Sequence, residues 1–168
     1  MSLIYLDNNA TTKLDAEVLQ AMLPYMETHY GNASSLQHAL GRAANQALTQ
    51  VRKQVAASLE VAEKEIFFNS GATEAINTVL KGIFTNYGRK GKHIITCKTE
   101  HKAVLSCCEA LEKLGAEITY LPVNKAGQIN LADLESSIRA DSILVCLMAA
   151  NNETGLCHPL KEIAEICN

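Results

Sequence analysis

The sequence predicts an α/β protein with an open, mostly parallel β-sheet and flanking helices. From residue 66 onward, short runs rich in β-branched and aromatic residues alternate with amphipathic helical patterns. This alternation is typical of parallel strands joined by right-handed crossover helices. Such sheets bind ligands at the carboxyl ends of their strands, so the loops at 69–73, 98–101 and 149–155 are the first places to look for a site.

The first part of the chain is expected to be helical after an extended start. Residues 1–15 are polar and rich in turn-forming residues. Apolar residues recur at helical spacing from Ala16 to Met26, and a Gly-Asn-Ala-Ser-Ser loop follows at 31–35. An alanine-rich helix with a single apolar stripe is then predicted from about His38 to Leu59.

The second part of the chain carries the strand–helix alternation. Short β-rich runs predict strands at Ile66–Phe68, His93–Cys97, Glu117–Leu121 and Ile143–Met148. Helical periodicity, with Gly115 and Pro159 as boundary residues, predicts helices at Thr73–Tyr87, Lys102–Lys113, Leu131–Arg139 and Pro159–Asn168. A parallel sheet normally continues after a crossover helix, so we expect the front part of a larger domain.

Composition and charge indicate a globular domain and exclude several classes of protein. Of the 168 residues, 48% are hydrophobic and 20% charged, which excludes a disordered or collagen-like chain. The net charge of −3 gives no basic surface for a nucleic acid. The longest apolar run, 143–150, is far shorter than the roughly 20 residues that span a bilayer. We therefore expect neither a nucleic-acid nor a membrane partner.

The cysteines indicate reduced thiols. The six cysteines include no Cys-x-x-Cys pair and no zinc-finger spacing, so no metal site is predicted. The N-terminus shows neither the basic segment nor the apolar stretch of a secretory signal. A cytoplasmic location is the resulting expectation.

The loop from Asn69 to Glu74 is a candidate anion site at a predicted strand-to-helix junction. Gly71 lets the backbone approach a ligand closely, and the first amides of the helix favour an anion. Ser70 and Thr73 add hydroxyl donors suited to phosphate. The alternative is an ordinary helix start, with a hydroxyl cap and Glu74 in the first turn. A Gly-x-Gly-x-x-Gly motif and a Walker lysine are both absent.

The loop Thr99-Glu100-His101 follows the second predicted strand. A histidine at a strand end can stack on a planar ring or shuttle a proton. The alternative is a capping or partly buried histidine, with Glu100 and Lys102 in a solvated turn.

The loop from Ala149 to Gly155 follows the most hydrophobic predicted strand. Asn151, Asn152 and Glu153 either orient polar groups of a ligand or bond the loop's own backbone. Metalloprotease and α/β-hydrolase motifs are absent.

A series of motifs in this order resembles the cysteine desulfurase family of pyridoxal-phosphate enzymes, which is aminotransferase class V with fold type I. The motifs are Tyr5-Leu6-Asp7-Asn8-Asn9-Ala10-Thr11-Thr12, Gly31-Asn32-Ala33-Ser34-Ser35 with His38 and Gly41, Ser70-Gly71-Ala72-Thr73-Glu74, Lys98-Thr99-Glu100-His101-Lys102-Ala103-Val104 and Asn151-Asn152-Glu153-Thr154-Gly155. The resemblance implies the front part of a fold type I transferase large domain. Residues 1–15 are then an N-terminal segment at the edge of the small domain and active site. Residues 16–168 are the first part of the cofactor-binding large domain, truncated at its C-terminal end.

The resemblance also implies roles for individual residues. Ala72 and Thr73 bind the phosphate of pyridoxal 5′-phosphate, and Asn152 hydrogen-bonds the 3′-oxygen of its ring. His101 stacks on the pyridine ring and serves as the catalytic histidine in proton transfer. The family reaction takes sulfur from L-cysteine, leaving L-alanine and an enzyme persulfide, and passes the sulfur to an iron–sulfur scaffold or a thiolation relay. A homodimer is the expected assembly.

Several departures from the family pattern limit what the resemblance implies. The family's cofactor-bearing lysine, its aspartate facing the pyridine nitrogen, its substrate arginine and its persulfide cysteine all correspond to positions beyond Asn168, so we expect the chain alone to be inactive. Ala33, Ala149 and His158 replace the family's usual Pro, His and Gln. The alternatives are a catalytically dead binding module of the same fold, or another fold type I enzyme such as a selenocysteine lyase or a class V aminotransferase.

Overall fold

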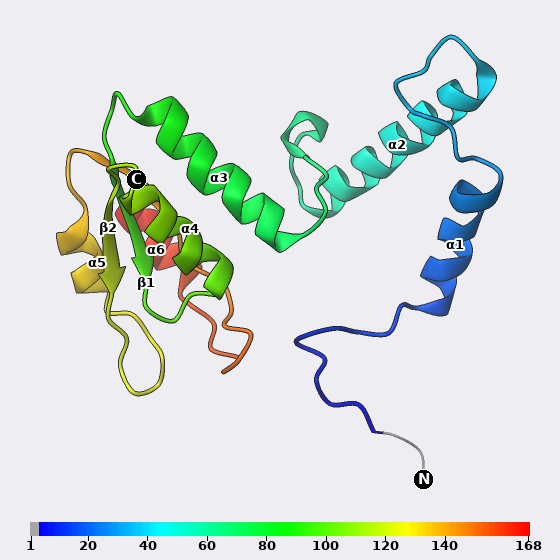
Figure 1. The fold of residues 1–168 in the computed structure, drawn as a ribbon. Helices are drawn as coiled ribbons and strands as arrows, with labels where there is room; N and C mark the ends of the chain where they lie inside the picture. The colour runs from blue at the N-terminus through cyan, green and yellow to red at the C-terminus, as the bar shows by residue number, and fades with distance from the viewer. Residues whose placement is uncertain (1–3) are drawn as a thin grey trace. The chain divides into compact units, whose positions relative to one another are not determined.

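The computed structural model describes residues 4–168, which form two compact units (Figure 1). The first unit ends at Phe68 and the second runs from Asn69 to Asn168. The second unit contains a parallel three-stranded sheet with helices packed on it, so the predicted α/β class is confirmed.

The first unit consists of two helices and a short 3-10 turn, named α1 (Ala16–Glu27), α2 (Ala39–Ser58) and η1 (Glu63–Glu65). α1 begins where it was predicted, because Asp15 caps it with a 2.8 Å hydrogen bond from the Glu17 amide. α2 is capped by His38, whose Nδ1 accepts a hydrogen bond from the Gly41 amide at 3.1 Å.

Gly41 allows the loop before α2 to pack directly on the first turn of the helix. A Cβ at this position would lie 1.9 Å from the carbonyl oxygen of Ser35 and 2.9 Å from that of Asn32. Asn45, one turn further on, holds the same loop through a 3.1 Å hydrogen bond to the Ala33 carbonyl. Only glycine fits, so this glycine of the motif is required for packing.

The prediction of a strand at Ile66–Phe68 is wrong. Within residues 4–168 this segment pairs with no strand, and the Arg52 guanidinium donates a hydrogen bond to the Ile66 carbonyl. The same guanidinium lies 4.9 Å from the centre of the Phe68 ring. A strand needs a neighbouring strand to bond its backbone groups. The β-rich composition of this segment is therefore not enough to form a strand, and the segment packs along α2 instead.

The sheet of the second unit has β1 (His93–Cys97) between β2 (Glu117–Leu121) and β3 (Ser142–Val145), and both pairings are parallel. His93 pairs with the first residue of each neighbour, and the register with β3 shifts by one residue immediately afterwards. All residues of β1 are buried. Because the strands are parallel, their carboxyl ends lie at one edge of the sheet.

Helices cover both faces of this sheet (Figure 1). They are α3 (Ala72–Tyr87), α4 (Lys102–Glu112), α5 (Leu131–Ser137) and α6 (Leu160–Cys167). α3 packs against α4, and α5 packs against α6. Each observed helix lies within two residues of its predicted bounds. Among residues 4–168, none of the helices has the length and apolar character needed to cross a lipid bilayer.

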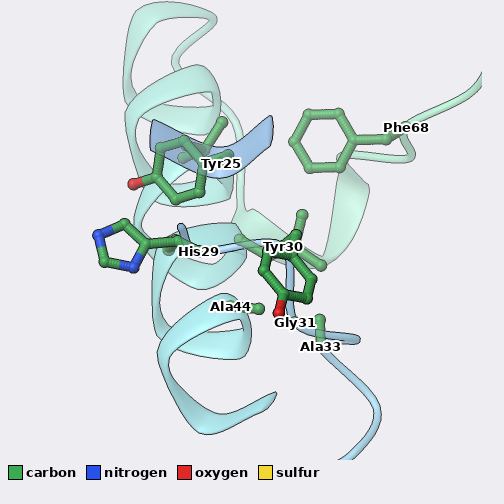
Figure 2. A pocket seen from close by; sticks show the side chains of 10 residues that line it. Tyr25, His29, Tyr30, Gly31, Ala33, Ala44 and Phe68 are labelled. Atoms are coloured by element: carbon green, nitrogen blue, oxygen red, sulfur yellow. The ribbon is translucent and has the colours of Figure 1, made fainter. Parts of the chain in front are cut away.

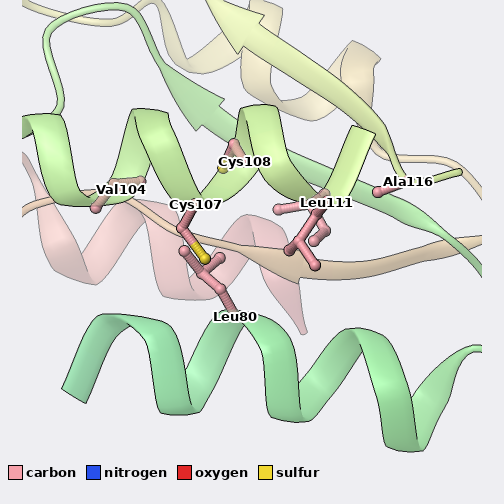
Figure 3. Close-up of a cluster of buried hydrophobic side chains, with 7 residues drawn as sticks. Leu80, Val104, Cys107, Cys108, Leu111 and Ala116 are labelled. Atoms are coloured by element: carbon pink, nitrogen blue, oxygen red, sulfur yellow. The ribbon is translucent and has the colours of Figure 1, made fainter. Parts of the chain in front are cut away.

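The core of the second unit consists of two apolar clusters, one on each face of β1. Ile94 belongs to the cluster with α3 and α4, while Ile95 and Cys97 belong to the cluster with α5 and α6. This alternation follows from the two-residue period of a strand. Figure 3 shows the first cluster, in which Leu80 of α3 points toward Cys107 of α4. A parallel sheet buried on both faces is the usual arrangement in α/β proteins.

β3 ends at Val145, three residues before the predicted end at Met148. The Cys146 amide still bonds to the Ile95 carbonyl of β1 at 2.8 Å. The Met148 amide instead donates to a side-chain oxygen of Glu100 at 2.6 Å. A side chain thus takes the place of the next backbone partner, and the strand ends.

Candidate functional site

The first candidate group is the N-terminal turn of α3. Its N-cap residue, Gly71, has φ of 151°, and a Cβ there would meet nothing within 4 Å. No side chain makes a capping hydrogen bond to this helix, and Ala72 and Thr73 are both exposed. The first amides of a 16-residue helix therefore face outward with the positive end of the helix dipole. Such a turn suits an anion such as phosphate.

Glu74 determines which groups at this turn remain as donors. Its Oε2 accepts hydrogen bonds from the Ser70 amide at 2.7 Å and from the Ser70 hydroxyl at 2.6 Å. These bonds hold the pKa of the Glu74 carboxyl below its ordinary value. The Ser70 hydroxyl, expected to be a phosphate donor, is thus bonded to a carboxylate. The backbone amides of Ala72 and Thr73 remain as donors at this turn.

His101 lies between β1 and α4 and is the N-cap of α4. Its Nδ1 accepts a hydrogen bond from the Ala103 amide at 3.1 Å, so the neutral ring carries its proton on Nε2. The residue is exposed. The capping role considered in the sequence analysis is therefore real, and it fixes the ring while leaving one face and Nε2–H available.

The two asparagines after β3 have different environments. Asn151 is buried, and its amide nitrogen donates to the Thr99 carbonyl at 3.1 Å. Its side-chain oxygen accepts from the amides of Glu153 and Thr154 at 2.9 and 3.0 Å. Asn152 is exposed and donates to the Glu153 carboxylate at 2.8 Å. Asn151 thus shapes the loop, and Asn152 presents a carboxamide at its surface.

Glu100 is buried and does not form the solvated turn considered from the sequence. It is 7% exposed, and its Oε1 accepts the Met148 amide hydrogen bond. The thiol of Cys97 donates to the same oxygen at 3.7 Å. Burial raises the pKa of Cys97, so this thiol stays protonated and able to donate. One sequence signal was present: Glu100 lies close after the end of β1 at Cys97, and a carboxylate that is buried there needs a partner.

The loops after β1 and β3 are therefore hydrogen-bonded to each other at the carboxyl edge of the sheet. His101 follows Glu100, and Asn152 follows Asn151, so each site residue is next to one of these ties. α3 leads into β1 and α4 leaves it, so both helices begin at this edge (Figure 1). The groups expected at this edge are helix amides, an imidazole and a carboxamide. Convergence of Ala72, Thr73, His101 and Asn152 on one cleft stays a prediction.

A separate pocket of about 510 Å³ lies in the first unit, between α1, α2 and Phe68 (Figure 2). Its polar groups are those of Tyr25, His29 and Tyr30, and its remaining walls are apolar. It includes Gly31 and Ala33 of a sequence motif but no residue of the three loops above. Among residues 4–168, no group of three histidine, cysteine or acidic side chains gathers as a metal site.

Comparison with known sequences gives the family. The family model described as aminotransferase class-V matches residues 4–168. Cysteine desulfurase IscS of Anaeromyxobacter sp. (strain Fw109-5) is 50% identical over 163 residues, which are 97% of this chain and 40% of that protein. Cysteine desulfurase of Homo sapiens is 47% identical over 165 residues, which are 98% of this chain and 36% of that protein. The chain thus spans about 40% of the length of these curated relatives.

Solved structures agree with the sequence comparison. A NifS-like protein matches with a TM-score of 0.94 at 40% identity, over 97% of this chain and 44% of that one. A structure described as SspA in complex with cysteine matches with a TM-score of 0.92 at 32% identity, over 97% of this chain and 47% of that one. The chain therefore belongs to the aminotransferase class-V family of pyridoxal-phosphate-dependent enzymes, and its relatives in that family are named cysteine desulfurases.

Proposed function

We propose that this chain supplies the phosphate- and ring-binding edge of a pyridoxal-phosphate-dependent cysteine desulfurase, which takes sulfur from L-cysteine and leaves L-alanine. The observation that carries the proposal is the hydrogen-bonded pair of loops at the carboxyl edge of the sheet, which bear His101 and Asn152. The named relatives support the same reaction, since cysteine desulfurases match nearly the whole chain.

The residues at this edge suit a flat, phosphorylated ring. The uncapped first turn of α3 offers the amides of Ala72 and Thr73 to phosphate, in open space beside Gly71. The exposed imidazole of His101 offers a face for stacking, and the Asn152 carboxamide offers a hydrogen bond to a ring oxygen. The Glu74 carboxylate accepts its hydrogen bonds from Ser70, which leaves the amides of Ala72 and Thr73 to the phosphate.

In this proposal the residues bind, orient and move a proton. The helix amides anchor the phosphate, and Asn152 orients the ring about that anchor. His101, held by its Nδ1 bond to Ala103, presents Nε2 to exchange a proton with the substrate. When bound, pyridoxal phosphate supplies an electron-withdrawing ring that stabilises negative charge on the substrate carbon.

The wider activity follows from the same relatives and is equally a proposal. We infer a cytoplasmic homodimer whose persulfide sulfur passes to an iron–sulfur scaffold or a thiolation relay. We assign residues 1–15 to an active-site edge and 16–168 to the cofactor-binding domain. None of the eleven lysines stands in the family's cofactor-attachment context, so the 168-residue chain alone should release no sulfide from L-cysteine.

The direct test is binding of pyridoxine 5′-phosphate, which has the ring and phosphate but no aldehyde to react with surface lysines. His101→Asn keeps a side chain that can cap α4 but removes the imidazole, so affinity should fall about tenfold. His38→Asn is the matched control, because His38 caps α2 through the same Nδ1-to-amide bond. This control should leave affinity unchanged.

Calorimetry with both variants decides the proposal. Equal affinities for the wild type and His101→Asn would show that the imidazole does not contribute to binding. If plain pyridoxine binds as tightly as its phosphate, the helix amides do not bind the phosphate. No saturable binding of either compound would favour the alternative of a cofactor-free binding module.

A further inference from the structure

We propose that Glu100 is a positioning residue, whose buried carboxylate ends the pairing of β3 with β1 and holds the Asn152 loop against the His101 loop. This assignment deepens the proposed function, on which its relevance to cofactor binding rests.

The hydrogen bonds at the end of β3 show what Glu100 replaces. In a parallel pair, ladder bonds recur every two residues along each strand. The Cys146 amide bonds to the Ile95 carbonyl, so the next bond of the series would join the Met148 amide to the Cys97 carbonyl. The Met148 amide instead bonds to the Glu100 carboxylate, and the Cys97 carbonyl accepts the Glu100 amide at 3.4 Å. Glu100 thus provides a hydrogen-bond partner for the last backbone group of each strand, and the two groups do not bond to each other.

The environment of Glu100 makes this contact energetically important. Glutamate is rarely this buried unless it is paired, because removing a carboxylate from water is costly. At 2.6 Å the hydrogen bond from the Met148 amide is shorter than the usual N–H···O distance of about 2.9 Å, and the Cys97 thiol adds a weaker donor. Lys102, two residues further on, is exposed, so burial in this turn is specific to Glu100.

A second tie beside the first makes the two loops one unit. Asn151 bonds to the Thr99 carbonyl, and Met148 bonds to the Glu100 side chain. Two adjacent residues of the first loop therefore hold the second loop on either side of Ala149 and Ala150. His101 is the next residue after Glu100, and Asn152 is the next residue after Asn151. The backbone at both site residues is therefore set by ties one residue away, and loss of the Glu100 carboxylate should displace both.

The experiment uses the full 168-residue chain and follows the loops by NMR. The chain has four methionines, so selective ¹⁵N-methionine labelling isolates the Met148 amide. Glu100→Ala removes the acceptor and should lower the exchange protection of that amide at least about tenfold. It should also shift the His101 ring and Asn152 carboxamide signals. Glu109→Ala, which removes an exposed carboxylate from α4, is the control and should change none of them.

Glu100→Gln tests positioning separately from general stability. Glutamine keeps a neutral acceptor of the same reach, so the His101 and Asn152 signals should return toward the wild-type positions, while the Met148 amide proton moves upfield. If Glu100→Ala does not fold, this variant decides alone, by the upfield Met148 shift with both site signals retained.

Two results would overturn the assignment. One is an unchanged Met148 amide in Glu100→Ala, and the other is a changed Met148 amide with the His101 and Asn152 signals unmoved. Pyridoxine 5′-phosphate titration of the same samples tests the proposed function independently. A wild type that does not bind it, but whose loops respond as described, refutes the cofactor site and leaves Glu100 as the tie between the loops.

Discussion

The two units of this chain have similar helical patterns but bury them to different extents. In the second unit, apolar side chains of four helices meet a sheet and form two buried clusters. In the first unit, α1 has no buried residue, and α2 buries only Gly41 and Ala56. The apolar stripe that predicted α1 is largely exposed, with Leu19 41% and Met26 62% accessible.

An amphipathic pattern therefore predicts a helix but does not show which surface packs against its apolar face. In the second unit the strands that alternate with the helices provide the opposing apolar surface. In the first unit, α1 and α2 alternate with no strand within the described residues. Helices gain most of their stability from tertiary packing, so the second unit should hold most of the stability of the chain.

The thiols of the second unit give the strongest test of whether its core is closed. Burial, with Cys146 nearby, raises the pKa of Cys108 to about 12, while Cys157 is exposed. At pH 8 iodoacetamide should therefore modify Cys157 at least about a thousandfold faster than Cys108. Peptide mapping by mass spectrometry measures both rates. Alkylation of Cys108 and Cys157 at similar rates in the folded chain would show that the core is open.

A leucine truncation in each unit compares their packing directly. Leu80 is fully buried in the cluster of Figure 3, whereas Leu19 lies on α1. Leu80→Ala should lower the free energy of unfolding by about 3 kcal/mol, because it leaves a cavity. Leu19→Ala should lower it by less than about 1 kcal/mol, since little apolar area is uncovered. Urea denaturation gives both values, and equal losses would contradict the contrast between the units.

His93 gives the smallest expected effect, which is a pH dependence within the second unit. Its Nδ1 and Nε2 lie 2.6 and 2.8 Å from the hydroxyls of Ser142 and Thr119. Burial, with the Arg139 charge, lowers the pKa of His93 from its ordinary 6.5. Below pH 6.5 the unfolded chain binds more protons than the native one, so stability falls as the pH falls. Urea denaturation from pH 7 to 5 should show a smaller loss in the free energy of unfolding for His93→Gln than for the wild type. An equal pH dependence in the two proteins would rule out His93 as its source.

The fold was predictable where the local sequence pattern and the tertiary environment favour the same element. Helix starts followed their caps, as at Asp15, and strands β1 and β2 match the predicted bounds. Ile66–Phe68 failed because strand formation depends on a partner, and composition does not show whether one is present. β3 ended early because the Glu100 side chain replaced a backbone acceptor, which no periodicity reveals.

The meeting of the candidate loops was predictable from the sequence, whereas their individual contacts were not. Parallel topology explains why the loops containing His101 and Asn152 meet at one edge. The sequence does not distinguish Asn151 from Asn152, and only the structure shows that the first is buried and bonded to Thr99. Glu100 was missed because a carboxylate between Thr99 and His101 suggests solvent, while its actual partner is 48 residues away.

The proposed cofactor site is tested most directly by an amide chemical-shift map of the chain titrated with pyridoxine 5′-phosphate. We expect the largest shifts at Ala72, Thr73, His101 and Asn152, and we expect them to saturate together with one dissociation constant. Signals of α1 and of the pocket around Tyr25 and His29 in the first unit should stay in place. The largest shifts in that pocket, or no saturable shift at α3 and the two loops, would contradict the proposed site.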